Sequence, residues 1–345
     1  MKKQQDKASG KKALEPPKKL ADYELSQPVQ LLLFELSGPT EEKYSHLVEL
    51  YDFIPKYFWG KPQRIDGRFL GYLEREFECR GQAYRVRITP ARLIGPDGAE
   101  RDCFPGQREE LVEDALRKLG SAGKGYFLDD EAGVVFSLYE LQRELKKRGH
   151  DYNLRQIKDA LLICAKTSLE VETADGCSVM VASLFDAIGL QTREDWQGEG
   201  TKTKAFVRFN SLVTASIRRS SFRQFNYETS MGYKSVIARQ LHKRMAYFFR
   251  QASITQQYTI LLTTVIRDFG LTKYKQLRDN LRQVEHALTE MEQKNVVLAW
   301  KVERIYEAQR PNKLADARFI ITPHPQFVSE VIKANEKEAK KRLKQ

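Results

Sequence analysis

The cysteine and histidine side chains, which in other proteins ligate metals or act in catalysis, are scattered along this 345-residue chain. A zinc site takes closely spaced cysteines or histidines, and metal-assisted phosphodiester cleavage takes clustered histidines beside a nucleophile. Neither spacing occurs in the set Cys79, Cys103, Cys164, Cys177, His46, His150, His242, His286 and His324. The sequence therefore predicts no metal site, no cofactor and no catalytic residue, and we expect a protein that is not an enzyme.

Two short glycine-rich segments that end in lysine, 120–124 and 198–202, are superficially similar to phosphate-binding loops. A loop of the Walker type needs four residues between its glycines and a serine or threonine after its lysine. Both segments lack that spacing, and Gly125 follows the lysine of the first. We therefore expect no nucleotide-hydrolysing site in either segment.

The charge balance points to a polyanionic partner. The chain carries 58 Lys and Arg residues against 46 Asp and Glu residues, a formal net charge of +12. No apolar run reaches the length of a membrane span and no signal-peptide pattern follows Met1, so nucleic acid is favoured over a membrane. Four widely separated cysteines are typical of a reduced protein, and a cytoplasmic location is expected.

The most informative spacing of basic and apolar residues lies in the stretch 258–323. Its pattern predicts a short helix closed by Gly270, a longer helix over about 274–294, and a β-hairpin with strands 296–305 and 318–322. The apolar residues of the longer helix recur every three or four positions, as one buried stripe requires. They are Leu277, Leu281, Val284, Leu288 and Met291.

Helix, turn, helix and hairpin in this order describe a winged helix, whose second helix enters the DNA major groove. The face opposite the apolar stripe is basic, which suits phosphates and base edges. We therefore predict DNA contacts from this helix, the turn before it and the polar hairpin segment 307–315. The candidate residues are Lys273, Lys275, Arg278, Arg282, His286, Arg310 and Lys313. The competing interpretation is an ordinary solvated helix face.

The same order of elements occurs earlier in the chain, which favours the DNA-binding interpretation. A helix over 138–148 closed by Gly149, a helix begun by Asn153 and a hairpin over 169–185 follow one another. The basic residues on or near the outer face of the second of these helices are Arg155, Lys158 and Lys166. Leu162 also points outward, and we predict that it lies in a dimer or interdomain contact.

These patterns predict an α+β protein in which two tandem winged helices follow a β-rich N-terminal region. A long helix over 232–250 joins the two, and Arg239, Lys243 and Arg244 are expected away from its apolar face. The aromatic run 44–59 is expected to be core rather than a base-stacking surface. The predicted regions are a disordered basic arm (1–20), a linear-motif and aromatic segment (21–60), a β-meander (61–105), the first winged helix (106–228), the second winged helix (229–325) and a charged tail (326–345).

The apolar segment Gln-Leu-Leu-Leu-Phe at 30–34 stands between Pro28 and the pair Gly38-Pro39. An exposed run this apolar must be buried or held by a partner. One interpretation is an edge or core strand. The other is a short linear motif, because the segment is similar to the Gln-Leu-x-Leu-Phe form that binds the bacterial sliding clamp. The residues that would contact the clamp are Gln30, Leu31, Leu33 and Phe34.

Two winged helices joined by a long helix resemble the theta-type plasmid replication initiators, the RepA and TrfA-like family. The resemblance covers roughly 111–323 and rests on element order and on the patches 136–141, 158–161 and 235–245. It implies binding to repeated double-stranded origin sequences (iterons), melting of adjacent AT-rich DNA with contact to its single strand, and recruitment of the host helicase, initiator and sliding clamp. It also implies a role in plasmid copy control, a monomer–dimer equilibrium and a bacterial cytoplasmic location at the plasmid or nucleoid.

A winged-helix transcriptional repressor with no replication role is the alternative. The clamp-like segment and the tandem units favour the initiator. Binding to single-stranded DNA separates the two, because a repressor has no need of it.

Overall fold

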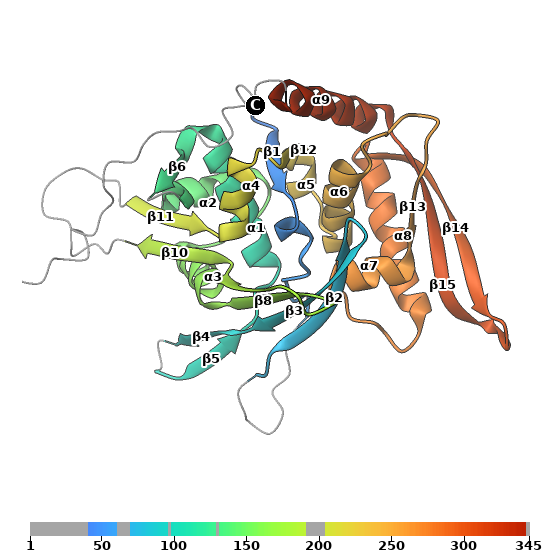
Figure 1. Ribbon diagram of the computed structural model, residues 1–345, viewed down its shortest axis with the longest axis horizontal. Helices are drawn as coiled ribbons and strands as arrows, with labels where there is room; N and C mark the ends of the chain where they lie inside the picture. Colours follow the sequence, from blue (N-terminus) through green and yellow to red (C-terminus); the bar gives the residue numbers. More distant parts are fainter. Residues whose placement is uncertain (1–40, 61–69, 96–97, 129–130, 191–203, 343–345) are drawn as a thin grey trace, which may run out of the picture.

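The computed structural model describes residues 41–60, 70–95, 98–128, 131–190 and 204–342, and its helices and strands are mixed along the chain (Figure 1). The mixed composition agrees with the expected class. An N-terminal unit, which ends with helix α4 (Ser211–Arg218), and a C-terminal unit, which begins at strand β13 (Tyr258–Leu261), lie side by side. Helix α6 (Val236–Phe248) stands between them.

The N-terminal unit is built around helix α1, which is covered on several sides. A four-stranded sheet has the order β10-β11-β7-β6, and all of its pairs are antiparallel. The elements are α1 (Gln107–Leu119), β6 (Gly125–Leu128), β7 (Glu131–Ser137), α2 (Leu138–Lys147), α3 (Leu154–Lys166), β10 (Phe185–Leu190) and β11 (Lys204–Phe209). A five-residue π-helical turn, η4 (Gly120–Lys124), follows α1.

A second sheet, of order β2-β3-β8-β9, replaces the separate meander that the sequence predicted. Its strands are β2 (Leu73–Cys79), β3 (Gln82–Thr89), β8 (Ser168–Thr173) and β9 (Val179–Ser183). Val86 pairs with Val171 across the β3–β8 contact, so the first hairpin completes the sheet of the hairpin expected over 169–185. Strands β4 (Ala91–Ile94) and β5 (Glu100–Cys103) form a separate two-stranded sheet. Burial of Val86 and Ile88 requires this long-range partner.

The aromatic run near the N-terminus is core, as predicted. Strand β1 (Tyr44–Val48) pairs with β12 (Phe222–Asn226), and the short 3-10 helix η3 (Tyr51–Phe53) follows it. The side chains of Tyr44, Tyr51, Phe53 and Tyr57 are buried. Because β1 and β12 are far apart in sequence, this pair ties the start of the described chain to the segment that leads into α6.

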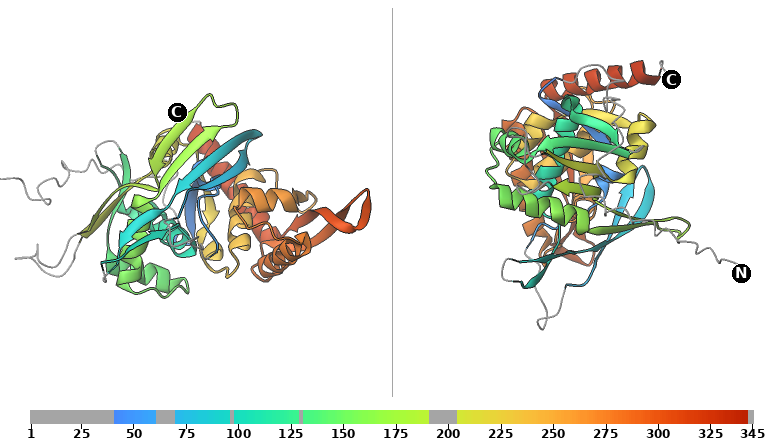
Figure 2. Two further views of the ribbon diagram at one scale, coloured as in Figure 1. Left: turned by 90° about the horizontal axis from the view of Figure 1, so that it is seen from below. Right: turned by 90° about the vertical axis from the view of Figure 1, so that its left-hand side faces the viewer.

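The C-terminal unit contains the predicted order of helix, turn, longer helix and hairpin, with changed boundaries. Its elements are β13, α7 (Leu262–Asp268), α8 (Leu277–Gln293), β14 (Val297–Glu307) and β15 (Arg310–Pro323), with sheet order β13-β15-β14. Residues 258–261 are a strand rather than the start of a helix, because they pair with β15. The segment 310–315, expected to be a polar loop, belongs to β15. The hairpin projects from the body in Figure 2.

Helix α8 begins at Leu277, later than the expected start near 274. The Asn280 side chain holds the preceding turn, since its Nδ2 donates to the Thr272 carbonyl at 2.9 Å and its Oδ1 accepts from the Tyr274 amide at 2.9 Å. This local bonding competes with earlier helix formation. The predicted stop at the end of α7 is confirmed, because Gly270 has a φ of 63° that favours glycine.

Arg239 and Lys243 of α6 contradict the expectation that they lie away from the buried surface. Both side chains are buried against α1. Helix α6 is covered on more than its apolar face, and acidic residues of α1 supply the partners that make burial of these cations tolerable. Helix α5 (Tyr227–Met231) precedes α6, and helix α9 (Pro325–Arg342), the predicted charged tail, packs on β12 through its buried Phe327 and Val331.

Candidate nucleic-acid interface

Helix α8 has one buried side and one exposed basic side. Leu281, Val284, Leu288 and Met291 are buried as predicted, whereas Leu277 is half-buried at the helix start. Each successive turn of the helix therefore places an apolar residue in the core, and the opposite face is left to solvent. That opposite face presents Arg278, Arg282 and His286, which are all exposed.

The two arginines of α8 are positioned differently. Arg278 Nη2 donates to the Asn312 carbonyl oxygen of β15 at 2.9 Å, so this side chain is held against the hairpin. The Arg282 side chain is 76% exposed and has only a 3.5 Å contact with Asp279, one turn earlier on the helix. An exposed pair at this spacing is worth a few tenths of a kcal/mol, so Arg282 can exchange Asp279 for a phosphate or base edge at little cost.

A groove of about 290 Å³ runs between α8 and the hairpin. Its lining residues are Arg278, Leu281, Arg282, Glu285, Arg304, Tyr306 and Leu314. Sequence reasoning missed Arg304 and Tyr306 of β14. A signal was available, because the two follow Trp300 and Val302 at a spacing of two, and Trp300 and Val302 pack against the core on the same face of the strand.

The remaining basic residues predicted for this unit surround the start of α8. Lys273 and Lys275 are exposed in the turn before the helix, so the structure corrects the placement of Lys275 on the outer helix face. Arg310 and Lys313 are exposed on β15, where Lys313 Nζ lies 2.5 Å from a Glu307 carboxylate oxygen. Asn312, which accepts the Arg278 bond, stands between them in sequence, so the hairpin and the helix start form one basic surface.

The second predicted basic helix, α3, begins where the sequence indicated. The Asn153 side chain accepts a 2.9 Å bond from the Gln156 backbone amide, and the Gln156 side-chain oxygen accepts a 2.9 Å bond from the Asn153 backbone amide. Arg155 and Lys158 are exposed on this helix, opposite buried Ile157.

The end of α3 lies next to strand β4. Lys166 is exposed, and its Nζ lies 3.4 Å from the Arg92 carbonyl oxygen of β4. Leu162 is half-buried, and its predicted contact with another unit or copy stays a prediction. Helices α3 and α8 lie in different units (Figure 1), so the structure does not bring the two basic faces into one patch.

A buried group of charged residues, which the sequence did not reveal, joins α1 to α6. Glu110 lies 3.1 Å from Arg239 and 3.3 Å from Lys243, and Asp114 lies 2.6 Å from Lys243. Gln240 Nε2 also donates to Glu110 at 2.7 Å. We call Glu110, Asp114, Arg239 and Lys243 the α1–α6 charge cluster. Its bonds hold the helix that leads into the C-terminal unit against the centre of the N-terminal unit.

The pKa shifts in this cluster follow burial and charge. Burial disfavours the charged form of Glu110, but Arg239 and Lys243 outweigh it and lower its pKa. Burial raises the pKa of Asp114 to about 6, because Lys243 offsets the burial only in part and Glu110 adds repulsion. Burial opposes the charge of Lys243 as well, yet Asp114 and Glu110 raise its pKa. The cluster therefore depends on each of its ionic partners.

Two predicted features lie outside the described residues, namely the basic arm 1–20 and the clamp-like segment 30–34. Within the described part of the chain, no helix is long and apolar enough to cross a membrane. In that same part, no three His, Cys, Asp or Glu side chains gather in a way that could hold a metal ion.

No protein-family model matches the chain, and no curated protein matches it in sequence. Among solved structures, a crystal structure of RctB domains 2–3 aligns with 78% of this chain and 96% of its own length, at 11% identity and a TM-score of 0.44. A selenomethionine derivative of domains 2 and 3 of RctB aligns at 10% identity and a TM-score of 0.45, over 75% of this chain and 93% of its own. The Pi initiator protein in complex with iteron DNA aligns at 11% identity and a TM-score of 0.43, over 63% of this chain and 91% of its own.

Proposed function

We propose that this chain is a sequence-specific DNA-binding protein that initiates replication, and that each unit acts as a winged helix. The observation that carries the DNA-binding part is α8, whose exposed basic face borders a groove beside a projecting hairpin. A helix of this kind fits the DNA major groove, and a hairpin beside it can reach the flanking backbone. The initiator part is supported by the sequence resemblance over roughly 111–323.

In this proposal, some residues of α8 and the hairpin read bases and others contact phosphates. Arg282, free to leave Asp279, reads a base edge, and Arg278 is positioned by the Asn312 carbonyl at the rim of the groove. Arg304 and Lys313 hold phosphates, which fix the register of the helix without reading sequence. The chain acts by binding, and no catalytic step is assigned to it.

Helix α3 supplies a second and weaker contact through Arg155 and Lys158. The two basic faces belong to separate units, so one chain would cover two neighbouring segments of DNA. A net charge of +12 adds attraction that does not depend on sequence and weakens with salt.

A footprint on the DNA that flanks the gene, with affinity measured for Arg282→Ala and Arg278→Ala, tests the DNA-binding part. Loss of a base-contacting arginine costs about 1–3 kcal/mol of specific binding and relaxes the preference at that base. Lys333→Ala, an exposed change on α9, is the matched control and should leave the affinity unchanged. If both arginine variants bind like the control, α8 is not the reading helix.

The finer part of the proposal is an initiator that binds iterons, opens the adjacent AT-rich DNA and recruits the host helicase, initiator and sliding clamp. Repeated protected sites one or two helical turns apart are the expected footprint. Permanganate reactivity of the flanking AT-rich DNA should rise on binding, and single-stranded DNA from that region should bind. A single protected site with neither effect would favour the repressor.

A further inference from the structure

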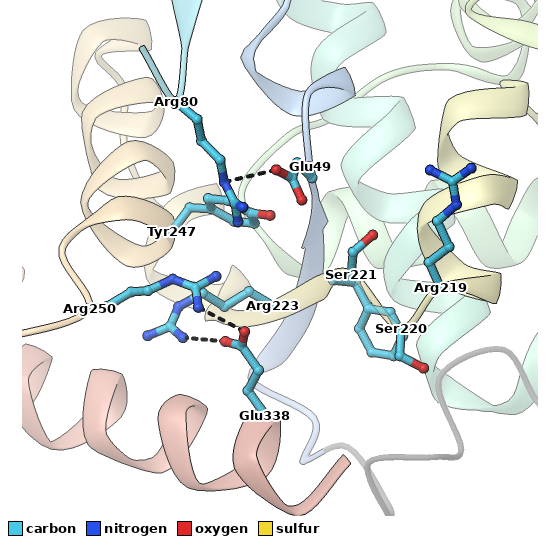
Figure 3. A pocket seen from close by; sticks show the side chains of 10 residues that line it. Glu49, Arg80, Arg219, Ser220, Ser221, Arg223, Tyr247, Arg250 and Glu338 are labelled. Atoms are coloured by element: carbon cyan, nitrogen blue, oxygen red, sulfur yellow. Dashed lines mark hydrogen bonds and ion pairs between the residues drawn. The ribbon is translucent and has the colours of Figure 1, made fainter. Parts of the chain in front are cut away.

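A pocket rich in arginine lies where the N-terminal unit, α6 and α9 meet, and it shares no lining residue with the groove beside α8 (Figure 3). Its volume is about 220 Å³. Arg80 comes from the β2–β3 turn, Arg219 from the end of α4, Arg223 from β12 and Arg250 from the segment after α6. Segments that are distant in sequence therefore bring four guanidinium groups to one cavity.

The lining carries more positive charge than its own carboxylates neutralise. Glu338 of α9 is shared by Arg223 at 3.1 Å and Arg250 at 2.8 Å, and Glu49 pairs with Arg80 at 2.8 Å. Four arginines and two glutamates leave a formal charge of +2.

Arg219 is the pocket arginine that pairs with neither Glu49 nor Glu338. It is exposed, lies across the pocket from Arg80 and Arg250 (Figure 3), and its guanidinium has no hydrogen bond or ion pair to any residue that the structure describes. The surplus charge therefore lies on the side of the pocket opposite the paired arginines.

One of the arginines is fixed in place before any ligand arrives. The Arg223 side chain is 1% exposed, its Nε donates to the Ala246 carbonyl at 2.6 Å and its Nη2 to the Val331 carbonyl at 3.4 Å. Burial lowers the pKa of Arg223, although Glu338 opposes the shift. A fixed cation at the low-dielectric wall of a pocket attracts an anion more strongly than a solvated surface arginine does.

We propose that this pocket binds a phosphate group. The planar guanidinium fork donates two parallel hydrogen bonds to phosphate oxygens, and several arginines around one cavity match a multiply charged tetrahedral anion better than a single carboxylate. The cavity lies below the roughly 300–1,000 Å³ of sites for drug-sized ligands, so it suits phosphate or pyrophosphate rather than a whole dinucleotide. Ser221 also lines this space, and its hydroxyl donates to the Ser216 carbonyl at 3.3 Å.

A phosphate held between Arg219 and Arg250 would connect the end of α4 with the segment that follows α6. It would therefore couple the N-terminal unit to the chain entering the C-terminal unit. The phosphate could belong to a small phosphorylated molecule or to the backbone of bound DNA, and the two sources share the same chemistry.

Isothermal titration of the full chain with inorganic pyrophosphate and with inorganic phosphate tests the site. Arg219→Gln removes the cation that has no partner and should weaken pyrophosphate binding about tenfold, through the loss of charge-assisted hydrogen bonds. Arg143→Gln, an exposed arginine of α2 outside the pocket, is the matched control and should bind like the unaltered chain. Arg80→Gln is a second pocket variant, with the same expected loss, for use if Arg219→Gln does not fold.

Absence of binding to the unaltered chain would overturn the proposal, and so would equal affinities for the pocket variants and the control. A second experiment, with DNA, identifies the source of the phosphate. If the DNA backbone fills the pocket, pyrophosphate competes with DNA and Arg219→Gln lowers the salt slope of DNA binding by about one. If a small molecule fills it, DNA affinity is unchanged in Arg219→Gln. Arg282→Ala keeps pyrophosphate binding in either case, so failure at this pocket and failure of α8 as the DNA-reading helix give different results.

Discussion

Replacing Glu110 with glutamine tests how the two units are held together. The Glu110 carboxylate accepts bonds from Arg239, Gln240 and Lys243, and its side chain is 1% exposed. Glutamine keeps the size but removes the charge, so Arg239 loses its ionic partner in the cluster and Lys243 keeps only Asp114. Leaving a buried charge without compensation costs about 3–5 kcal/mol, a large part of a typical stability of about 5–15 kcal/mol.

Equilibrium unfolding in urea is the assay, read by midpoint and slope for each variant. Glu303→Gln is the matched control, because its 3.3 Å pair with Arg318 has side chains 54% and 51% exposed and should contribute about 0–1 kcal/mol. The double variant Glu110→Leu with Arg239→Met removes both charges and should recover much of the loss. If Glu110→Gln unfolds at the same urea concentration as Glu303→Gln, the buried Glu110 carboxylate contributes no more to stability than an exposed one.

Three further predictions concern pH, helix capping and partner binding. Burial lowers the pKa of His242 from an ordinary 6.5 to about 3, and repulsion from Lys243 adds to the shift. The unfolded chain therefore binds the extra proton, and the free energy of unfolding falls as pH drops below about 6.5. In urea unfolding between pH 4 and 6.5, His242→Phe should reduce this slope by up to about 1.4 kcal/mol per pH unit. Asn153→Ala removes the cap of α3 and should cost about 1 kcal/mol in the same assay, and an unchanged midpoint would argue against the cap. Leu33→Ala with Phe34→Ala should abolish binding to the sliding clamp while the Tm stays unchanged, whereas a large fall in Tm with clamp binding intact would make the segment a core strand.

Local features of the sequence determined much of the candidate interface. The apolar repeat of α8 predicts which side is buried because helical periodicity is a property of a few consecutive turns, and the exposed positions of Arg278 and Arg282 follow from it. The helix ends at Gly270 and Asn153 were also predictable, since a positive φ or a capping bond involves only residues nearby in the chain.

The hairpin side of the interface was only partly predictable. Arg304 and Tyr306 were missed. Their spacing of two places them on the same side of β14 as Trp300 and Val302, but the apolar alternation that marks a strand face weakens near the strand end. The start of α8 shifted because the Asn280 side chain bonds to the turn before it, and a sequence does not state which of several possible bonds an asparagine makes.

Contacts between distant segments were decided only by the tertiary structure. Strand β3 looks like a member of a local meander until its pairing with β8 is seen, because an alternating strand does not specify its partner. Arginine and lysine usually lie on the solvated face of a helix. Arg239 and Lys243 are buried because Glu110 and Asp114 of α1 lie against them. A basic residue is exposed or buried according to whether a folded neighbour compensates its charge, and for Arg239 that neighbour lies 129 positions away in the chain.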